Sequence, residues 1–597
     1  MNNPLESMIH QAIQAFQNGN LNSAEIILDR VLAAHSKNLP ALHILGLIKA
    51  SQSKHKEAAE LLKRAIRLNP SDPSLHYNLA KALQESGADK ESLPHHKKAV
   101  ELNPTNPEAW LNYGRSLSNL GLNIDALDVY KNSLQINPNY TEAFLNIGAT
   151  LKDLDRYDEA INYADKALSI NPTLSEAWSN RGIALKELKR YDEALASYDQ
   201  AISLKPDYHD AWSNKGVTLG DLKRYDEALA SYNQAISLKP DYHEAWFNRG
   251  VTLNELKRYD EALASYDQAI SLKPEYAEAY NNRGIIRLSL RNFQQGFADC
   301  GYRWKSKDFP SKPQKTTLPS CAETGLKGHL LIWAEQGIGD EIFYASLLPT
   351  LATREVSITL SADKRLHPIY KRSFPKIDII DKEILLTSSV DTGFDAQSPI
   401  GDLGYLLGVD EAAIKATRSP YLKGDTTRRD DICKVIAGFG SGITCGIAWK
   451  STNKQFGADK SISLSSFEAL LCSPGIQFVN LQYGDVKDEI QQVKSKFLVD
   501  IHQVPNVDVF QDLDGLLALI DACDVIVTTS NVTAHLAGSL GKLAAVLVPY
   551  GKGKIWYWHH NDEKSFWYPS LRLFYQDNPL SWNNPIKDCS DWIKALL

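Results

Sequence analysis

The sequence predicts an α-helical repeat solenoid followed by an α/β module of two lobes. A strict 34-residue period runs through the first half of the 597-residue chain, whereas short β-rich apolar runs alternate with helical patterns in the second half. A chain of this length usually folds into about four domains, but a repeat array grows in one dimension and takes the place of several. We therefore expect a repeat domain at residues 1–305, a linker at 306–326, and the two lobes at 327–435 and 436–597.

The composition is that of an ordinary folded protein, with 23% charged and 43% hydrophobic residues. A formal net charge of −7 gives no overall attraction to nucleic acid or to an anionic membrane. The seven cysteines form no CxxC pair and no metal-ligand spacing, so we expect a reducing, cytoplasmic location. Because no run of about 18 apolar residues occurs and no basic segment precedes an apolar one at the start, neither a membrane span nor a secretion signal is predicted.

Prolines and aromatic residues mark the period in the first half. In the unit 175–208, Trp178, Gly182 and Tyr198 occupy positions 4, 8 and 24, and the next two units repeat them. This pattern resembles the tetratricopeptide repeat, a helix–turn–helix unit in which small residues let helices approach, aromatics fill the gaps and proline ends the second helix. Irregular units near residue 5 and from Ala277 are expected to cap the array. The periodic prolines are Pro70, Pro104, Pro138, Pro172, Pro206, Pro240 and Pro274.

Asparagine occupies position 6 of the first helix in seven units, which packing does not explain. It is a poor helix-interior residue, and its amide both donates and accepts hydrogen bonds. In tetratricopeptide superhelices similar to this one, including that of the O-linked N-acetylglucosamine transferases, such a ladder clamps the backbone of an extended polypeptide. The alternative is passive inheritance by recently duplicated units. The column comprises Asn78, Asn112, Asn146, Asn180, Asn214, Asn248 and Asn282.

Alternating β-rich and helical patterns in the second half are typical of parallel-sheet α/β structure. Turn residues and variable segments around 391–442 separate the first two apolar runs from the last four, which indicates two Rossmann-like lobes. The predicted strands are His329–Trp333, Val356–Leu360, Ile443–Ala448, Gln477–Leu481, Val525–Thr528 and Ala544–Val548.

Two strand-to-helix turns are candidate ligand sites. Gly337 and Gly339 in the first lobe permit tight backbone geometry beneath a ligand, before a helix expected to begin near Asp340, although the third glycine of GxGxxG is absent. In the second lobe, residues 530–535 open a helix whose free N–H groups and positive dipole end suit a diphosphate. The donor-binding candidates in this second turn are Ser530, Asn531, Thr533, His535 and Leu536.

Spaced motifs cover nearly all of residues 325–597: WAEQGIGDEIFYASLLP, GIAWK, VNLQYGD, AHLAGSLGK and SFWYPSLRLF. With the repeats, they resemble the tetratricopeptide-linked bacterial glycosyltransferases, whose catalytic part is similar to the heptosyltransferases of lipopolysaccharide synthesis. The resemblance implies a GT-B fold, a nucleotide-sugar donor held mainly by the C-terminal lobe and an acceptor that reaches the cleft from the other side. Some proteins of this kind modify flagellin on serine or threonine.

Glycosyl transfer needs a general base for the attacking hydroxyl and positive potential for the departing phosphate. We expect the chain to supply both, without a metal or other cofactor. Asp340 matches the aspartate of the GD turn to which the base role is attributed in the heptosyltransferases; capping the following helix is its alternative role. Lys450, at the end of a strand, and Lys460 are candidates for neutralising the diphosphate. A surface location is the alternative, and it is stronger for Lys460.

Further candidates have equally simple structural alternatives. Gln482 and Tyr483 follow a predicted strand and are placed to contact the nucleotide base, although a turn in LQYGD explains them as well. Ser530 stands where many relatives have an acidic residue, which leaves the donor sugar open. A final cluster either stacks a sugar or base, or packs the last helix across the lobes; it comprises Trp556, Tyr557, Trp558, Trp567 and Tyr568.

The leading hypothesis is a protein O-glycosyltransferase that transfers a sugar from a nucleotide-sugar donor to serine or threonine of a protein acceptor held by the repeats. An adaptor with a degenerate transferase module is the first alternative. A transferase for lipid-linked or polysaccharide acceptors, in which the repeats recruit a partner enzyme, is the second.

Overall fold

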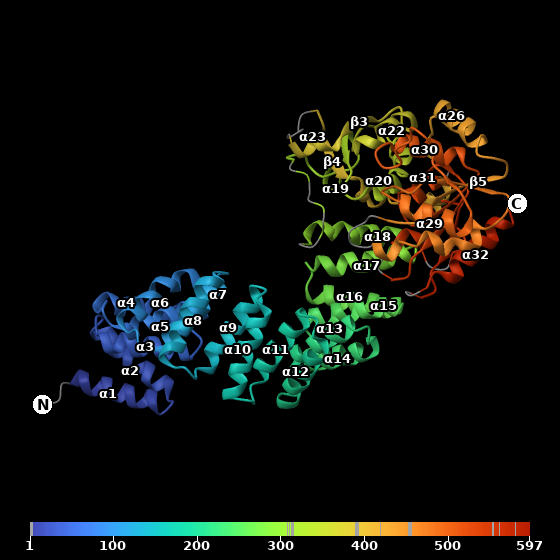
Figure 1. Ribbon diagram of the computed structural model, residues 1–597. Coiled ribbons are helices and arrows are strands. Elements are labelled where there is room, and N and C mark those ends of the chain that lie inside the picture. Colours follow the sequence, from blue (N-terminus) through green and yellow to red (C-terminus); the bar gives the residue numbers. More distant parts are fainter. Residues whose placement is uncertain are drawn as a thin grey trace. The chain divides into compact units, whose positions relative to one another are not determined.

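The computed structural model describes residues 4–306, 309, 311, 314, 316–387, 393–417, 420–451, 457–551, 554–559, 562–578 and 581–596. The predicted linker 306–326 lies partly outside these residues. Two compact units make up the chain, Met1–Arg249 and Gly250–Leu597. Figure 1 shows helix pairs along the first unit, and further helices followed by the strands in the second.

The first unit consists of helix pairs joined by short turns, as the 34-residue period predicts. The first helix of a pair mostly has 13 residues and the second 14. The helices are α1 (Pro4–Gln17), α2 (Leu21–Ala34), α3 (Leu39–Ser51), α4 (His55–Leu68), α5 (Pro73–Glu85), α6 (Asp89–Leu102), α7 (Pro107–Asn119), α8 (Asn123–Ile136), α9 (Thr141–Asp153), α10 (Tyr157–Ile170), α11 (Ser175–Glu187), α12 (Tyr191–Leu204), α13 (His209–Asp221), α14 (Tyr225–Leu238) and, across the unit boundary, α15 (His243–Glu255).

The turn within each pair contains one residue with a left-handed backbone. This conformation favours glycine, yet most of these positions carry other residues, so residue type does not reveal the pattern. The positions recur every 34 residues and include the irregular first and last pairs, which confirms that both follow the repeat geometry. They are Gly19, Ser53, Gly87, Gly121, Asp155, Lys189, Lys223, Lys257 and Arg291, with φ between 58° and 79°.

Glycine at position 8 is required by close helix packing within a pair. A Cβ atom added at Gly216 would lie 2.7 Å from Cε1 of Tyr232, and one at Gly182 would lie 2.6 Å from Cε1 of Tyr198. Both tyrosines are at most 2% exposed, so their rings have little space to move. The prediction that small residues let paired helices approach is therefore confirmed, and the position-24 tyrosines fill space within a pair.

Replacing Gly216 with Ala is expected to lower the free energy of unfolding by about 1–3 kcal/mol, because the added methyl overpacks this contact. Gly220 in the same helix has no atom within 4 Å of an added Cβ, so Gly220→Ala should raise stability by about 0.5–1 kcal/mol. Urea unfolding of the two variants checks both signs. Equal effects of the two substitutions would contradict the packing explanation.

The second unit begins with the last repeat helices and continues into the first lobe. None of the described helices combines the length and apolar character that a membrane crossing needs. The elements are α16 (Tyr259–Leu272), α17 (Ala277–Ser289), α18 (Phe293–Cys300), η1 (Gly301–Lys305), α19 (Cys321–Thr324), β1 (Gly328–Trp333), α20 (Ile338–Ala345), α21 (Leu348–Leu351), β2 (Val356–Ala362), η2 (Lys364–Leu366), α22 (His367–Ser373), β3 (Asp378–Asp381), α23 (Lys382–Thr387), β4 (Ala396–Pro399), η3 (Ile400–Asp402), α24 (Leu403–Leu406) and α25 (Glu411–Thr417).

The second lobe follows the same alternation of strands and helices. Its elements are α26 (Thr426–Ala437), β5 (Ile443–Ala448), α27 (Gly457–Lys460), η4 (Leu464–Phe467), α28 (Glu468–Leu471), β6 (Ile476–Asn480), α29 (Lys487–Phe497), β7 (Ile501–His502), α30 (Leu513–Ala522), β8 (Val525–Thr529), α31 (Val532–Leu540), β9 (Ala544–Val548), η6 (Trp556–Trp558), β10 (Leu571–Tyr575) and α32 (Asn583–Lys594).

Each lobe is built on a parallel sheet, as predicted. The first sheet has the order β3-β2-β1-β4 and the second the order β10-β9-β8-β5-β6-β7. The six predicted strands are all present, shifted by at most two residues at an end. Four described strands were not predicted: β3, β4 and β10 lie at sheet edges, and β7 has only two residues. The predicted fold class, a helical repeat solenoid followed by an α/β module, is confirmed.

The last repeat packs directly against the α/β module within the second unit. Phe293 of α18 stacks on Phe566 at a ring-centroid distance of 5.7 Å, and Phe297 meets Trp556 edge-to-face at 5.8 Å. Both phenylalanines belong to the hydrophobic core that also contains residues of β1 and α31. The end of the repeat array and both lobes therefore share one core.

Candidate functional site

A cavity of about 250 Å³ lies between the two lobes at the carboxyl ends of β1, β2, β5, β6 and β8. This volume is far more than the ~10–15 Å³ that one water molecule needs, so the cavity has room for a ligand. Ligands of open parallel sheets bind at this end of the strands. The described residues that line it are Gly337, Ile338, Gly339, Asp340, Arg365, Ser451, Lys460, Tyr483, Val509, Phe510, Leu513, Leu516, Ser530, Asn531, Val532, Thr533, His535, Ile555 and Tyr557.

Two helix N-termini, those of α20 and α31, meet at the cavity. Helix α20 begins at Ile338, close to the predicted start near Asp340, and its N-cap is Gly337, so Asp340 is not the capping residue. A Cβ atom on Gly339 would lie 3.1 Å from Cδ2 of His535 on α31, so glycine permits this close approach. Since both helices direct the positive ends of their dipoles here, the cavity suits an anionic ligand.

Asn531 builds the N-terminus of α31. Its side-chain oxygen accepts the Thr533 backbone N–H at 2.9 Å, which caps the helix. Its side-chain nitrogen donates to the Lys450 carbonyl at 3.2 Å, which ties the turn to the end of β5. Although Asn531 lines the cavity, these bonds assign its amide to positioning the turn.

Asp340 lies in the first turn of α20 and lines the cavity together with Lys460 and Tyr557. Burial raises the pKa of Asp340, while the charge of Lys460 and the Tyr557 hydroxyl, 3.4 Å from Oδ1, lower it. Burial also lowers the pKa of Lys460, which is only 5% exposed. Lys460 is therefore buried at the site, against the simple expectation of a surface lysine, and a carboxylate and an ammonium face the same cavity.

His535 presents a neutral imidazole to the cavity. It is 2% exposed, and burial lowers its pKa to about 3, so the ring is uncharged at neutral pH. The Tyr568 hydroxyl lies 3.2 Å from Nδ1. If the hydroxyl donates to Nδ1, Nε2 carries the proton and can donate to a ligand oxygen.

Two hydroxyl groups at the cavity are buried without a hydrogen-bond partner among the described residues. They are Oγ of Ser530, a residue 3% exposed, and Oγ1 of Thr533, which is fully buried. An unsatisfied buried polar group costs about 1–3 kcal/mol, so such groups are uncommon unless a ligand or water completes them. Both side chains line the cavity, which makes them candidate ligand contacts.

Three predicted donor-binding residues are not among the described residues that line this cavity. The Lys450 ammonium pairs with Glu489 of α29. Gln482 accepts the backbone N–H groups of Trp449 and Lys450 at 2.8 and 2.7 Å, so it joins the ends of β5 and β6. Leu536 is a core residue with no exposed surface. The structure gives each of these three a structural contact.

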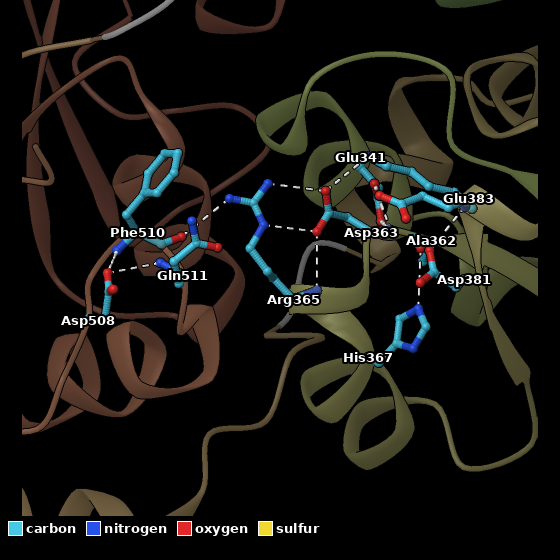
Figure 2. Close-up of polar contacts among 11 residues, drawn as sticks. Glu341, Ala362, Asp363, Arg365, His367, Asp381, Glu383, Asp508, Phe510 and Gln511 are labelled. Atoms are coloured by element: carbon cyan, nitrogen blue, oxygen red, sulfur yellow. Dashed lines mark hydrogen bonds and ion pairs between the residues drawn. The ribbon is translucent and has the colours of Figure 1, made fainter. Parts of the chain in front are cut away.

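The mouth of the cavity is aromatic and carries a cation that sequence reasoning missed. Tyr483 and Phe510 line it, with ring centroids 5.8 Å apart. Arg365, from the first lobe, lines it as well and donates to the Phe510 carbonyl at 3.3 Å (Figure 2). Only the position of Arg365 just after a predicted strand could have pointed to it.

The predicted aromatic cluster packs mainly as core. Trp558, Trp567 and Tyr568 are at most 7% exposed, and Tyr557 is the member that lines the cavity. Trp556 contacts Phe297 of the last repeat and Phe343 of α20, rather than the final helix. The cluster therefore joins the last repeat to α20, which neither sequence interpretation anticipated.

The predicted asparagine column divides into two groups in the first unit. Asn112 is 3% exposed and donates to the Tyr77 hydroxyl at 3.1 Å, and Asn78 contacts His43. The half-buried amides of Asn146, Asn180 and Asn214 have no partner among the described residues, which leaves them available to a ligand. Asn248 and, in the second unit, Asn282 are also half-buried, but they make contacts within the fold.

No group of three or more His, Cys, Asp or Glu side chains arranged to hold a metal ion occurs in the described part of the chain.

Comparisons with known proteins identify the repeats. Family models of the tetratricopeptide repeat match residues 46–87, 97–128, 141–174, 175–208, 213–277 and 258–300. The chain therefore carries tetratricopeptide repeats, a scaffold for protein–protein interaction.

Protein FlbA of Caulobacter vibrioides is 31% identical over 299 residues, which make up 47% of this chain and 46% of FlbA. The chain thus spans about half the length of this curated relative. Among solved structures, YrrB, a TPR protein with an unusual peptide-binding site, is 25% identical and covers 31% of this chain and 95% of its own, with a TM-score of 0.26. A tetratricopeptide repeat protein from Parabacteroides merdae is 19% identical, covering 47% and 98%, with a TM-score of 0.34.

Proposed function

We propose that this protein transfers a sugar from a nucleotide-sugar donor to a serine or threonine hydroxyl of a polypeptide that its repeats bind. The observation that carries the proposal is the cavity between the lobes, where two helix N-termini meet a half-buried carboxylate. This arrangement offers an anion site and a proton acceptor together, which are the two groups that glycosyl transfer requires.

In the proposed reaction, the acceptor hydroxyl oxygen attacks the anomeric carbon of the donor. Its proton passes to the carboxylate of Asp340, whose raised pKa favours proton uptake. The bond between the anomeric carbon and the phosphate oxygen breaks, and the nucleoside diphosphate leaves with the electron pair. Lys460, the His535 imidazole and the N-terminus of α31 stabilise the charge that develops on this phosphate.

In this proposal the repeats bind the acceptor. The amides of Asn146, Asn180 and Asn214 recur at a fixed position and can both donate to and accept from peptide groups. Such contacts bind a polypeptide backbone with little regard to its side chains. Acceptor binding and chemistry therefore reside in different parts of the chain.

Calorimetry of the full chain against UDP-, GDP-, CMP- and ADP-sugars, followed by intact-mass analysis of flagellin co-expressed with it, tests the proposal. We expect one class of donor to bind and the flagellin mass to increase by whole sugar residues. Absence of donor binding would refute it. Donor turnover with unmodified protein acceptors would redirect it to lipid-linked or polysaccharide acceptors.

Thr533→Val is expected to weaken donor affinity about 5- to 30-fold without lowering stability. The variant removes a buried hydroxyl that has no partner in the described protein, so folding loses no hydrogen bond while the ligand loses one. Calorimetry and thermal unfolding measure the two effects. In the control Thr528→Val, the lost hydroxyl contacts Asn531 and the Thr529 carbonyl at 3.0 Å, so stability should fall instead.

Replacing Asn146, Asn180 and Asn214 together with Ala is expected to weaken binding of a long acceptor polypeptide about 10- to 1,000-fold. Each amide contributes about 0.5–1.5 kcal/mol through hydrogen bonds to peptide groups. Fluorescence anisotropy with a labelled acceptor measures the loss, and donor affinity should not change. Since Asn112 is engaged inside the fold, Asn112→Ala should lower stability rather than affinity. If the triple variant bound the acceptor as tightly as the wild type, the proposed role of these three asparagines in acceptor binding would be contradicted.

A second candidate function is that of an adaptor that binds partners and catalyses no transfer. It is favoured by the matched family models, which all lie between residues 46 and 300. The donor calorimetry above decides between the two, because an adaptor has no use for a nucleotide sugar.

A further inference from the structure

Arg365 is fixed at the edge of the cavity by contacts from both lobes (Figure 2). Its Nε and Nη2 donate to the two carboxylate oxygens of Asp363 at 3.0 and 3.1 Å. Its Nη1 donates to the carbonyl of Phe510, which belongs to the second lobe, at 3.3 Å. Because all three nitrogen atoms are engaged, the guanidinium has a defined orientation where it lines the cavity.

Asp363 is itself held from two sides. The Lys382 ammonium donates to its carboxylate at 2.9 Å, and its backbone N–H donates to the buried carboxylate of Glu341 at 3.1 Å. Although burial opposes the effect, hydrogen bonds from Arg365 and Lys382 lower the pKa of Asp363, so the carboxylate stays charged at neutral pH. Glu341 follows Asp340 in α20. The residues that hold Arg365 in place are therefore connected to the helix that carries the proposed base.

The three hydrogen bonds of Arg365 leave two of its five N–H donors without a partner among the described residues. Arg372 provides a comparison, because it also joins the lobes. Both of its terminal nitrogens bond Asp514 at 2.9 Å, and one also donates to the Lys423 carbonyl, yet Arg372 is not among the described residues that line the cavity. An arginine can thus join the lobes without lining the cavity. Arg365 lines the cavity and also has two N–H donors without a partner among the described residues.

The charge of Arg365 is less sensitive to burial than that of Lys460. The pKa of Lys460 is lowered by burial, whereas the contact with Asp363 raises the pKa of Arg365 further. A planar guanidinium matches phosphate oxygens with paired N–H groups, which a lysine does not offer.

We infer that Arg365 binds the diphosphate of the nucleotide-sugar donor from the side of the first lobe. This inference rests on the proposed function. In this inference both lobes bind the donor. The N-terminus of α31 contacts the diphosphate from the second lobe, and the Arg365 guanidinium contacts it from the first.

Calorimetry of the full-length protein with UDP, GDP, ADP and inorganic pyrophosphate tests the inference. For the nucleoside diphosphate that binds most tightly, the corresponding nucleoside is titrated as well. Arg365→Met should weaken the diphosphate and pyrophosphate about 10- to 100-fold and leave the nucleoside unchanged, since only the phosphate contact is lost. Arg365→Lys should fall between, because it keeps a charge but not the paired donors.

Arg372→Met is the matched control, because it removes an interlobe arginine outside the cavity lining and should leave all affinities unchanged. Thermal unfolding of the arginine variants verifies that each is folded. Equal diphosphate affinity of Arg365→Met and wild type, or an equal loss for nucleoside and diphosphate, would overturn the inference while leaving the proposed function standing. Wild-type protein that binds none of the four probes would also overturn the inference, and the proposed function would fail with it only if none of the nucleotide sugars tested above bound either.

Discussion

Replacing Asp340 with Asn is expected to lower kcat for sugar transfer by about 10²- to 10⁴-fold, while affinities for donor and acceptor stay close to wild type. The amide has the size of the carboxylate but cannot accept the proton of the attacking hydroxyl. Mass-spectrometric measurement of product at saturating donor gives the rate, and calorimetry gives the affinities.

The pH dependence separates a base from a structural residue. A base acts when deprotonated, so kcat/KM of the wild type should fall as the pH decreases through the pKa of Asp340, which burial raises above that of an ordinary aspartate. The residual activity of Asp340→Asn should lack this decline. Asp459, an exposed carboxylate next to Lys460, provides the control, and Asp459→Asn should retain wild-type rates. Wild-type turnover by Asp340→Asn would remove the assignment of the base.

Replacing Arg303 with Met is expected to lower the free energy of unfolding of the second unit by about 3–5 kcal/mol. Arg303 contacts Glu335 at 2.8 Å and Asp402 at 2.6 Å, and the side chains of Arg303 and Glu335 are only 6% and 1% exposed. Its removal leaves two carboxylates without their cation in a region of low exposure, a situation that costs several kcal/mol. Urea unfolding followed by tryptophan fluorescence measures the loss.

An exposed ion pair gives the matching control. Arg190, the N-cap residue of α12, and Glu193 in its first turn form an i,i+3 pair with side chains 44% and 50% exposed. Such pairs contribute at most about 1 kcal/mol, so Arg190→Met should change stability little. An equal loss of unfolding free energy in Arg303→Met and Arg190→Met would contradict the argument that burial makes the ion pairs of Arg303 important for stability.

Much of the fold was predictable because the sequence patterns are local. The strand Ala544–Val548 was predicted with its observed bounds, since a fully buried parallel strand is a continuous apolar run. Strand β3 was missed because it is a four-residue edge strand containing two aspartates, and β7 because two residues carry no periodicity. Edge and very short strands depend on pairing with distant segments, which no local window contains.

The site was predictable where a residue lies in a strand-to-helix turn, and not where tertiary contacts decide its role. Asp340, Thr533 and His535 were predicted on motif grounds, and all three line the cavity. Lys450 was expected at a strand end and Lys460 more readily at the surface, yet Lys450 pairs with a neighbouring helix and Lys460 is buried at the cavity. Arg365 reaches a carbonyl 145 residues further along the chain, so its placement depends on how the two lobes associate.

The attachment of the final repeat to the lobes has a consequence for how this architecture can vary in length. Phe293 and Phe297 of the final repeat lie in the core shared with the lobes. In contrast, a unit in the interior of a tetratricopeptide array contacts only its two neighbours. Whole 34-residue modules upstream can therefore be gained or lost without disturbing the cavity between the lobes. The near-identical stretches at 175–208, 209–242 and 243–276 indicate that such duplication has occurred, so the length of the repeat array can evolve independently of the α/β module.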